Sequence, residues 1–135
     1  MINCETEVYS TVATAIRSQF SGVFVAGEAV AAPSSFPAVT LVEDDNSTYQ
    51  RSLDSSGQEN HATVMYTANV YSNKMPGKKS ECKAIMAVID TTMFAMGFTR
   101  VGNSPMEMPN ASASIYRMVA RYKAIISKEK MVYRR

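Results

Sequence analysis

The sequence predicts an α+β domain in which two helices pack on one face of a mostly antiparallel sheet, with an extended hairpin arm. Apolar residues recur at helical spacing in two segments and alternate at two-residue spacing in others. The order along the chain is helix, strands, helix, strands. The 135 residues, of which 46% are hydrophobic and 19% charged, fit one folded domain with its own core.

The first helix is expected at residues 5–20. Val8, Val12, Ile16 and Phe20 recur at the spacing of one helix face. Two glutamates stand in the first turn, where the helix dipole favours negative charge. This segment therefore predicts an amphipathic helix that buries one side.

Two strands are expected after this helix, at residues 23–25 and 37–45. The first is a short apolar run, and residues 26–35 form a connector of small residues. In the second, Val39 and Leu41 alternate with Thr40 and Val42. β-Branched residues in alternation favour an extended, half-buried strand.

A hairpin arm is expected at about residues 46–62, where the chain is polar and has no helical periodicity. The arm turns at residues 54–57, which read Asp-Ser-Ser-Gly. It returns through residues 61–73, which show the clearest strand alternation in the chain. One face of this strand carries Val64, Tyr66, Ala68 and Val70, and the other Thr63, Met65, Thr67, Asn69 and Tyr71.

A second helix is expected from Pro76-Gly77 to about Met96, followed by Gly97, a typical residue just past a helix end. Its apolar positions fall on one stripe. The stripe consists of Cys82, Ile85, Val88, Ile89, Thr92, Met93 and Met96.

Two more strand segments follow, at residues 98–101 and 115–126. Pro105 and Pro109 between them restrict that stretch to loop or sheet-edge geometry. As a strand, residues 115–126 separate an apolar face from a basic one, whereas a helix would scatter apolar groups around its whole circumference. A strand is therefore the favoured interpretation, with a helix as the alternative.

The charge distribution is polarised along the chain, although the formal net charge is only +2. Residues 1–60 carry a net −6, residues 61–113 a net +2 and residues 114–135 a net +6. We expect residues 1–126 to form the single domain and residues 127–135 a basic tail. Opposite charges on two parts of one chain favour head-to-tail self-association.

No catalytic, metal or cofactor motif was found in the sequence. His61 is the only histidine, which excludes a histidine-based metal cluster. Cys4 and Cys82 are far apart in the chain and predict reduced thiols in an intracellular protein. Residues 77–80, Gly-Lys-Lys-Ser, lack the other positions of a phosphate-binding loop. Neither a secretory signal nor a membrane span is expected, and no enzyme class is supported.

Two charged segments leave alternatives open. Residues 43–45, Glu-Asp-Asp, favour a solvated strand end, with a cryptic carboxylate or cation site as the alternative. The basic segment after residue 114 interleaves tyrosines with lysines and arginines, as nucleic-acid-binding surfaces do. Because Tyr116 and Tyr122 fall on the apolar face of the expected strand, docking of the basic face on an acidic neighbour is favoured over binding of nucleic acid.

Several blocks of the sequence resemble small neck and tail-completion proteins of tailed bacteriophages, and most of all the tail terminators. The blocks are FPAVTLVE at residues 36–43, VMYTANVYSN at 64–73, GKKSECK at 77–83, MGFTR at 96–100 and YRMVARY at 116–122. They span nearly the whole chain after Glu5. None is a catalytic signature, so the likeness lies in their order and spacing.

The resemblance implies a structural virion protein that forms a ring, typically six-fold, at the head-proximal end of the tail tube. Such a ring stops tube polymerisation, joins the tail to the head-side connector protein and lets DNA pass through its lumen without sequence-specific binding. Assembly in the host cytoplasm is expected, with no cofactor, metal, membrane or catalytic residue. The alternative within this group is another neck component, a head-closure or minor capsid protein.

The polarised charge suggests which residues join neighbouring subunits. A ring needs two different surfaces on each subunit, and opposite charges on them set register and encounter. We expect reversal of charge at Arg117 and Arg121 to weaken assembly at low salt. The candidate interface residues are Glu43, Asp44, Asp45, Asp54, Arg117, Arg121, Arg134 and Arg135.

Overall fold

The computed structural model describes residues 4–20, 22–27, 36–48, 61–74, 76–108, 115–127 and 132–133. Two helices and six strands are assigned within them. They are α1 (Glu5–Gln19), β1 (Phe24–Ala26), β2 (Ala38–Thr48), β3 (His61–Ser72), α2 (Lys78–Ala95), β4 (Thr99–Met108), β5 (Tyr116–Ser127) and β6 (Val132–Tyr133).

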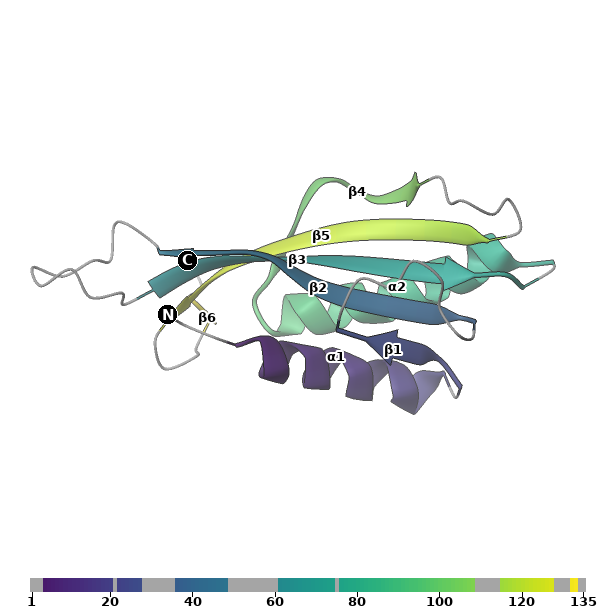
Figure 1. The fold of residues 1–135 in the computed structure, drawn as a ribbon, viewed down its shortest axis with the longest axis horizontal. Helices are drawn as coiled ribbons and strands as arrows, with labels where there is room; N and C mark the ends of the chain where they lie inside the picture. Colours follow the sequence, from purple (N-terminus) through teal and green to yellow (C-terminus); the bar gives the residue numbers. More distant parts are fainter. Residues whose placement is uncertain are drawn as a thin grey trace, which may run out of the picture.

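The strands form one mixed, mostly antiparallel sheet in the order β1-β2-β3-β5-β4, with β6 paired to β5 (Figure 1). The β1–β2 pair is parallel, and the β2–β3, β3–β5 and β4–β5 pairs are antiparallel. The α+β class and the mostly antiparallel sheet predicted from the sequence are therefore confirmed.

The long strands run further than their sequence patterns indicated. β2 continues through the polar residues 46–48, which pair with the first residues of β3. The antiparallel β2–β3 pair thus extends into the expected hairpin arm, whose remaining residues 49–60 lie outside the described part of the chain. β4 extends to Met108, whereas the sequence predicted a strand only over residues 98–101 because of Pro105. β4 is an edge strand, and at an edge a proline can be accommodated without loss of a hydrogen bond between strands.

Strand alternation gives the sheet an apolar face and a polar face. On the apolar face, Tyr66 lies opposite Tyr122 and Ala68 opposite Ala120. Tyr66 is fully buried, and its ring meets that of Phe98 edge to face at 5.5 Å between centroids. Figure 1 shows both helices below the sheet, and buried residues from both helices belong to the same core as this face.

The two helices run antiparallel to each other. α1 begins just after its N-cap residue Cys4, whose Sγ lies 3.6 Å from Tyr66 OH. The helix leads into β1, which pairs with the start of β2. α2 begins just after β3 ends, with Cys82 against Val70, and its far part reaches Tyr122 through Asp90. The C-terminus of α1 and the N-terminus of α2 therefore lie at the same end of the domain.

Candidate assembly surfaces

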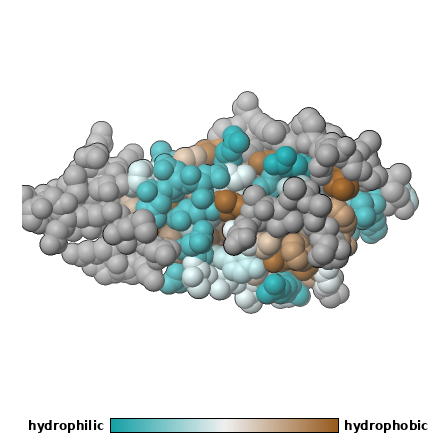
Figure 2. Space-filling view, in the orientation of Figure 1, coloured by the Kyte–Doolittle hydropathy of each residue, from teal (hydrophilic) through white to brown (hydrophobic). Residues whose placement is uncertain are grey.

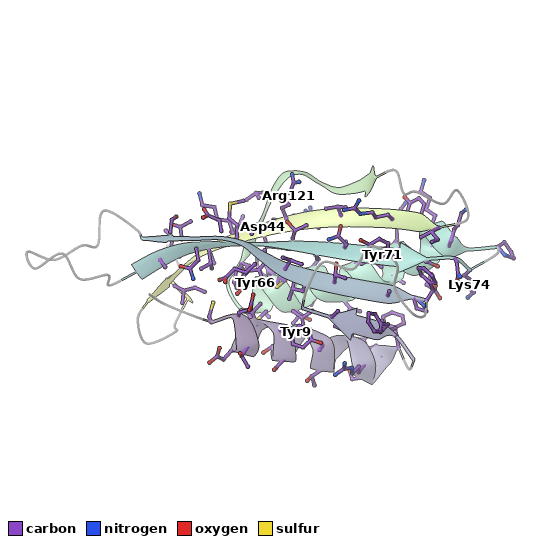
Figure 3. All side chains as sticks on the ribbon, in the orientation of Figure 1. Tyr9, Asp44, Tyr66, Tyr71, Lys74 and Arg121 are labelled. Atoms are coloured by element: carbon purple, nitrogen blue, oxygen red, sulfur yellow. The ribbon has the colours of Figure 1, made fainter. Side chains whose placement is uncertain are left out.

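The polar face of the sheet carries two of the expected interface arginines, Arg117 and Arg121. In the β3–β5 register, Arg117 lies opposite Tyr71 and Arg121 opposite Thr67. Figure 3 shows Arg121 of β5 close to Asp44 of β2, with Tyr71 of β3 further along the sheet. In Figure 2, hydrophilic residues gather over the middle of the view, around these strands.

Arg117 is held by its own chain. Its Nε and Nη2 both donate to Asn69 Oδ1, at 3.0 and 2.8 Å. Its guanidinium carbon lies 5.8 Å from the centre of the Tyr71 ring, within cation–π distance. Asn69 and Tyr71 are both buried. Arg117 therefore has a fixed position on the polar face, whether or not a second subunit contacts it.

Asp44 and Arg121 form the second charged feature of this face. Thr67 Oγ1 donates a hydrogen bond to Asp44 Oδ2. Partial burial raises the pKa of Asp44, and the positive charge of Arg121 opposes that rise. Both side chains are exposed. An acid and a base that we expected to meet across subunits thus already influence each other within one chain.

The acidic run of residues 43–45 is divided by a β-bulge. Glu43 lies opposite Tyr66 and Asp45 opposite Met65, so Asp44 has no partner residue in the β2–β3 register. Because Tyr66 is on the apolar face and Met65 on the polar face, Glu43 is separated from Asp45. The sequence argument that three consecutive strand residues do not converge on one cation agrees with this register.

Glu43 belongs to a hydrogen-bonded cluster at the N-terminal end of α1. Its Oε1 accepts from Tyr66 OH and from Asn46 Nδ2, both at 3.4 Å. Tyr66 OH also lies 3.6 Å from Cys4 Sγ. Burial first, and then the nearby Glu5 carboxylate, raises the pKa of Glu43.

This cluster does not activate a nucleophile. Burial raises the pKa of the Cys4 thiol and of the Tyr66 hydroxyl, so both stay protonated at neutral pH. Cys82 is fully buried with its Sγ 3.6 Å from the carbonyl oxygens of Val70 and Tyr116, and burial raises its pKa to about 12. Both cysteines are free thiols, as predicted.

The described ranges contain neither a candidate metal-binding cluster nor a helix that could span a membrane. No group of three or more His, Cys, Asp or Glu side chains there is placed to hold a metal ion. None of the helices in these ranges is long and apolar enough to cross a bilayer. Three of the candidate interface residues, Asp54, Arg134 and Arg135, lie outside the described part of the chain.

The described charges gather at the two ends of the domain. We define the basic end as the end where β3 leads into α2. It carries Arg17, Lys74, Lys78, Lys79, Lys83 and Arg117, with Glu81 as the one acid among the described side chains there. Figure 3 places Lys74 at this end. Ser72 Oγ donates to Glu81 Oε1 at 2.5 Å, which ties the end of β3 to the first turn of α2.

We define the acidic end as the opposite end, where α1 begins and β2 finishes. It carries Glu5, Glu7, Glu43, Asp44 and Asp45. The described bases nearby are Arg121, Lys123 and Arg100, of which Arg100 is paired with Asp90. Sequence reasoning assigned the basic surface to residues 114–135 and missed the lysines around the start of α2. The run of lysines from residue 74 to 83 was visible, but only the antiparallel helices place it opposite Glu5 and Glu7.

The chain was compared with known proteins on the basis of its sequence. It matches no protein-family model and no curated protein.

Proposed function

We propose that this chain is a structural subunit that assembles into a ring at the head-proximal end of a phage tail tube. In this role it stops tube polymerisation and joins the tail to the head-side connector. The observation that carries the proposal is the separation of charge between the acidic and basic ends of the domain. The sequence blocks that resemble tail terminators supply the biological setting.

A closed ring requires each subunit to present two different, complementary surfaces. The acidic end of one copy and the basic end of the next are such a pair. Exposed charges of this kind steer encounter and fix register more than they add affinity. Ring formation is therefore expected to depend strongly on salt, because charges separated by more than about 8 Å are screened at physiological ionic strength.

A charge-swap experiment tests the contact between the two ends. Lys74 and Asp45 are exposed and lie at opposite ends. Lys74→Glu and Asp45→Lys should each weaken assembly about three- to tenfold at low salt, since each replaces an attraction by a repulsion. The double variant K74E/D45K should restore assembly, because the swapped charges again attract between neighbours.

The readout is native mass spectrometry of the full chain at low and high salt, with electron microscopy to show closure. A closed ring for the wild type and recovery in the double variant support the proposal. A wild-type chain that stays monomeric at micromolar concentration refutes it. If the single variants assemble less well and the double variant does not recover, the end-to-end contact is refuted. A ring would then have to form through other surfaces.

A nucleic-acid-binding module is the second candidate, favoured by Arg117, Arg121 and Lys123 along one face of β5. Two observations oppose it: Arg117 donates to Asn69, and Asp44 lies near Arg121. Titration with duplex DNA at varied salt separates the two functions, since a nucleic-acid binder loses affinity steeply as salt rises and needs no ring. Another neck component of the virion remains the alternative within the phage setting.

A further inference from the structure

Arg117 uses only one side of its guanidinium group for contacts within its own chain. Its Nε and Nη2 donate to a single acceptor, Asn69 Oδ1, at 3.0 and 2.8 Å, so that side is occupied. The outer edge, formed by Nη1 and the second hydrogen of Nη2, has no acceptor among the described residues. Such an edge offers the two parallel donors that a carboxylate or a phosphate accepts in a bidentate contact.

The guanidinium group is held in place rather than free to move. It comes from β5 and lies over two residues of β3, because it bonds Asn69 and is 5.8 Å from the centre of the Tyr71 ring. Asn69 and Tyr71 are each only 7% exposed, so both supports are fixed by packing. An arginine positioned in this way binds a ligand without the loss of side-chain freedom that a solvated arginine undergoes.

A second polar group without a partner lies on the next strand of the same face. Thr40 of β2 is directly opposite Asn69, so strand alternation puts both side chains on the polar face. Thr40 is fully buried, and within the described ranges its Oγ1 has no hydrogen-bond partner. A buried hydroxyl of this kind lowers stability. Because Thr40 is closed to bulk water, its hydroxyl gains a partner only when another polar atom enters beside Asn69.

We propose that Arg117, Asn69 and Thr40 form a binding site for a carboxylate group on the polar face of the sheet. The outer edge of Arg117 donates to the carboxylate oxygens, and Asn69 Nδ2 and Thr40 Oγ1 are the further donors. Three groups that can all donate match a ligand that only accepts. Arg117 is the one charged group of the three, so the site fits a carboxylate better than a phosphate, which carries about 1.5 to 2 negative charges near pH 7.

The carboxylate can come from two sources. One is an acidic residue at the acidic end of a second copy, and this source rests on the proposed function, since Arg117 belongs to the basic end. The other is a free carboxylate ligand. The chemistry of the site is the same in both cases.

The first test titrates the full-length Asp45→Lys variant with sodium acetate at constant ionic strength. Asp45 is exposed at the opposite end of the domain, so this change leaves the site intact and disfavours the ring. The NMR signals of the Asn69 side-chain amide and the Arg117 guanidinium should shift and saturate. Half-saturation should need about tenfold less acetate than at Arg17, an exposed arginine in the last turn of α1. Sodium phosphate, titrated in the same way, should bind more weakly.

Two substitutions test the site through the Asn69 amide signal. Arg117→Lys keeps the positive charge but lacks the parallel donors, so it should weaken acetate binding about tenfold. Thr40→Val removes the unpartnered hydroxyl and should weaken binding about three- to tenfold, although it should make the fold more stable. Weaker binding by a more stable protein cannot be attributed to unfolding. Thr91→Val, which removes an exposed hydroxyl on α2, is the matched control and should bind acetate normally.

Comparison with the wild-type chain identifies the source of the carboxylate. If a second copy supplies it, the assembled wild type should not respond to acetate, because its sites are already filled, whereas Asp45→Lys should respond. If the ligand is free, both chains should respond equally.

Three outcomes would overturn the inference: a response of Arg117 no different from that of Arg17, tighter binding of phosphate than of acetate, or unchanged binding by Thr40→Val. A wild-type chain that forms no ring refutes the proposed function but leaves the acetate titration of Asp45→Lys unaffected. The inference and the proposed function therefore fail separately.

Discussion

Replacement of Arg117 by Met should destabilise the isolated subunit, because this arginine is bound inside its own chain. The variant keeps an aliphatic side chain over Tyr71 but removes both donors to Asn69 Oδ1. Asn69 is only 7% exposed, so its oxygen is left with poor access to water. An unsatisfied acceptor of this kind costs about 1–3 kcal/mol, and the lost cation–π contact adds about 0.5 kcal/mol.

The expected loss is therefore about 2 kcal/mol in the free energy of unfolding. With a urea dependence of about 2 kcal/mol per molar for a domain of this size, the unfolding midpoint should fall by about 1 M. The assay is urea unfolding followed by circular dichroism, at one low protein concentration for all variants. Arg121→Met is the matched control, because Arg121 is exposed and should change stability by less than about 0.5 kcal/mol.

A thermodynamic cycle makes the prediction specific. In an Asn69→Ala background the acceptor is absent, so Arg117→Met should cost clearly less than it does in the wild type. Equal midpoints for Arg117→Met and Arg121→Met would refute the reasoning. So would a full cost of Arg117→Met in the Asn69→Ala background. Either result would mean that Arg117 does not stabilise its own subunit, so that any role of this residue would lie in contacts between subunits.

Three further predictions concern buried polar groups. The raised pKa of Glu43 means that the folded state favours the protonated form of this carboxyl group. Its contribution to stability is complete below the unfolded pKa and is lost as pH rises through the higher folded pKa. Glu43→Gln should therefore flatten the fall in stability as pH rises above 4.5, measured by urea unfolding, and an unchanged pH profile would contradict this. Thr40 is fully buried and, within the described ranges, its Oγ1 has no hydrogen-bond partner, so Thr40→Val should stabilise the fold by about 1 kcal/mol in thermal unfolding, and a lower midpoint would contradict this. The Cys82 thiol, with its pKa near 12, should react with a disulfide reagent at pH 8 only as fast as the domain opens, and rapid labelling of the native protein would argue against its burial.

The helices and long strands could be predicted because each has a regular apolar period. Residues 5–20 and 115–126 repeat at helical and strand spacing, and α1 and β5 lie within one residue of those bounds. The free thiols also followed from composition. These features depend on local pattern, which one sequence contains.

The arrangement of the strands and of the charges could not be predicted in the same way. Nothing local indicates that β1 pairs parallel to β2, or that β5 lies between β3 and β4. The bulge at Asp44 depends on the fit between two strands, so the direction of that carboxylate was open. The basic end depends on the antiparallel helices, and the contact of Arg117 with Asn69 joins residues 48 positions apart.

The position of β5 in the sheet has a consequence for synthesis of the chain. β5 follows β3 and β4 in sequence but lies between them, so both of those strands keep an unpaired edge until residues 116–127 have left the ribosome. Exposed edges of this kind invite pairing with other chains. A nascent chain that ends before Tyr116 therefore lacks the strand that joins β3 to β4. We expect such chains to need chaperone protection until β5 has been synthesised.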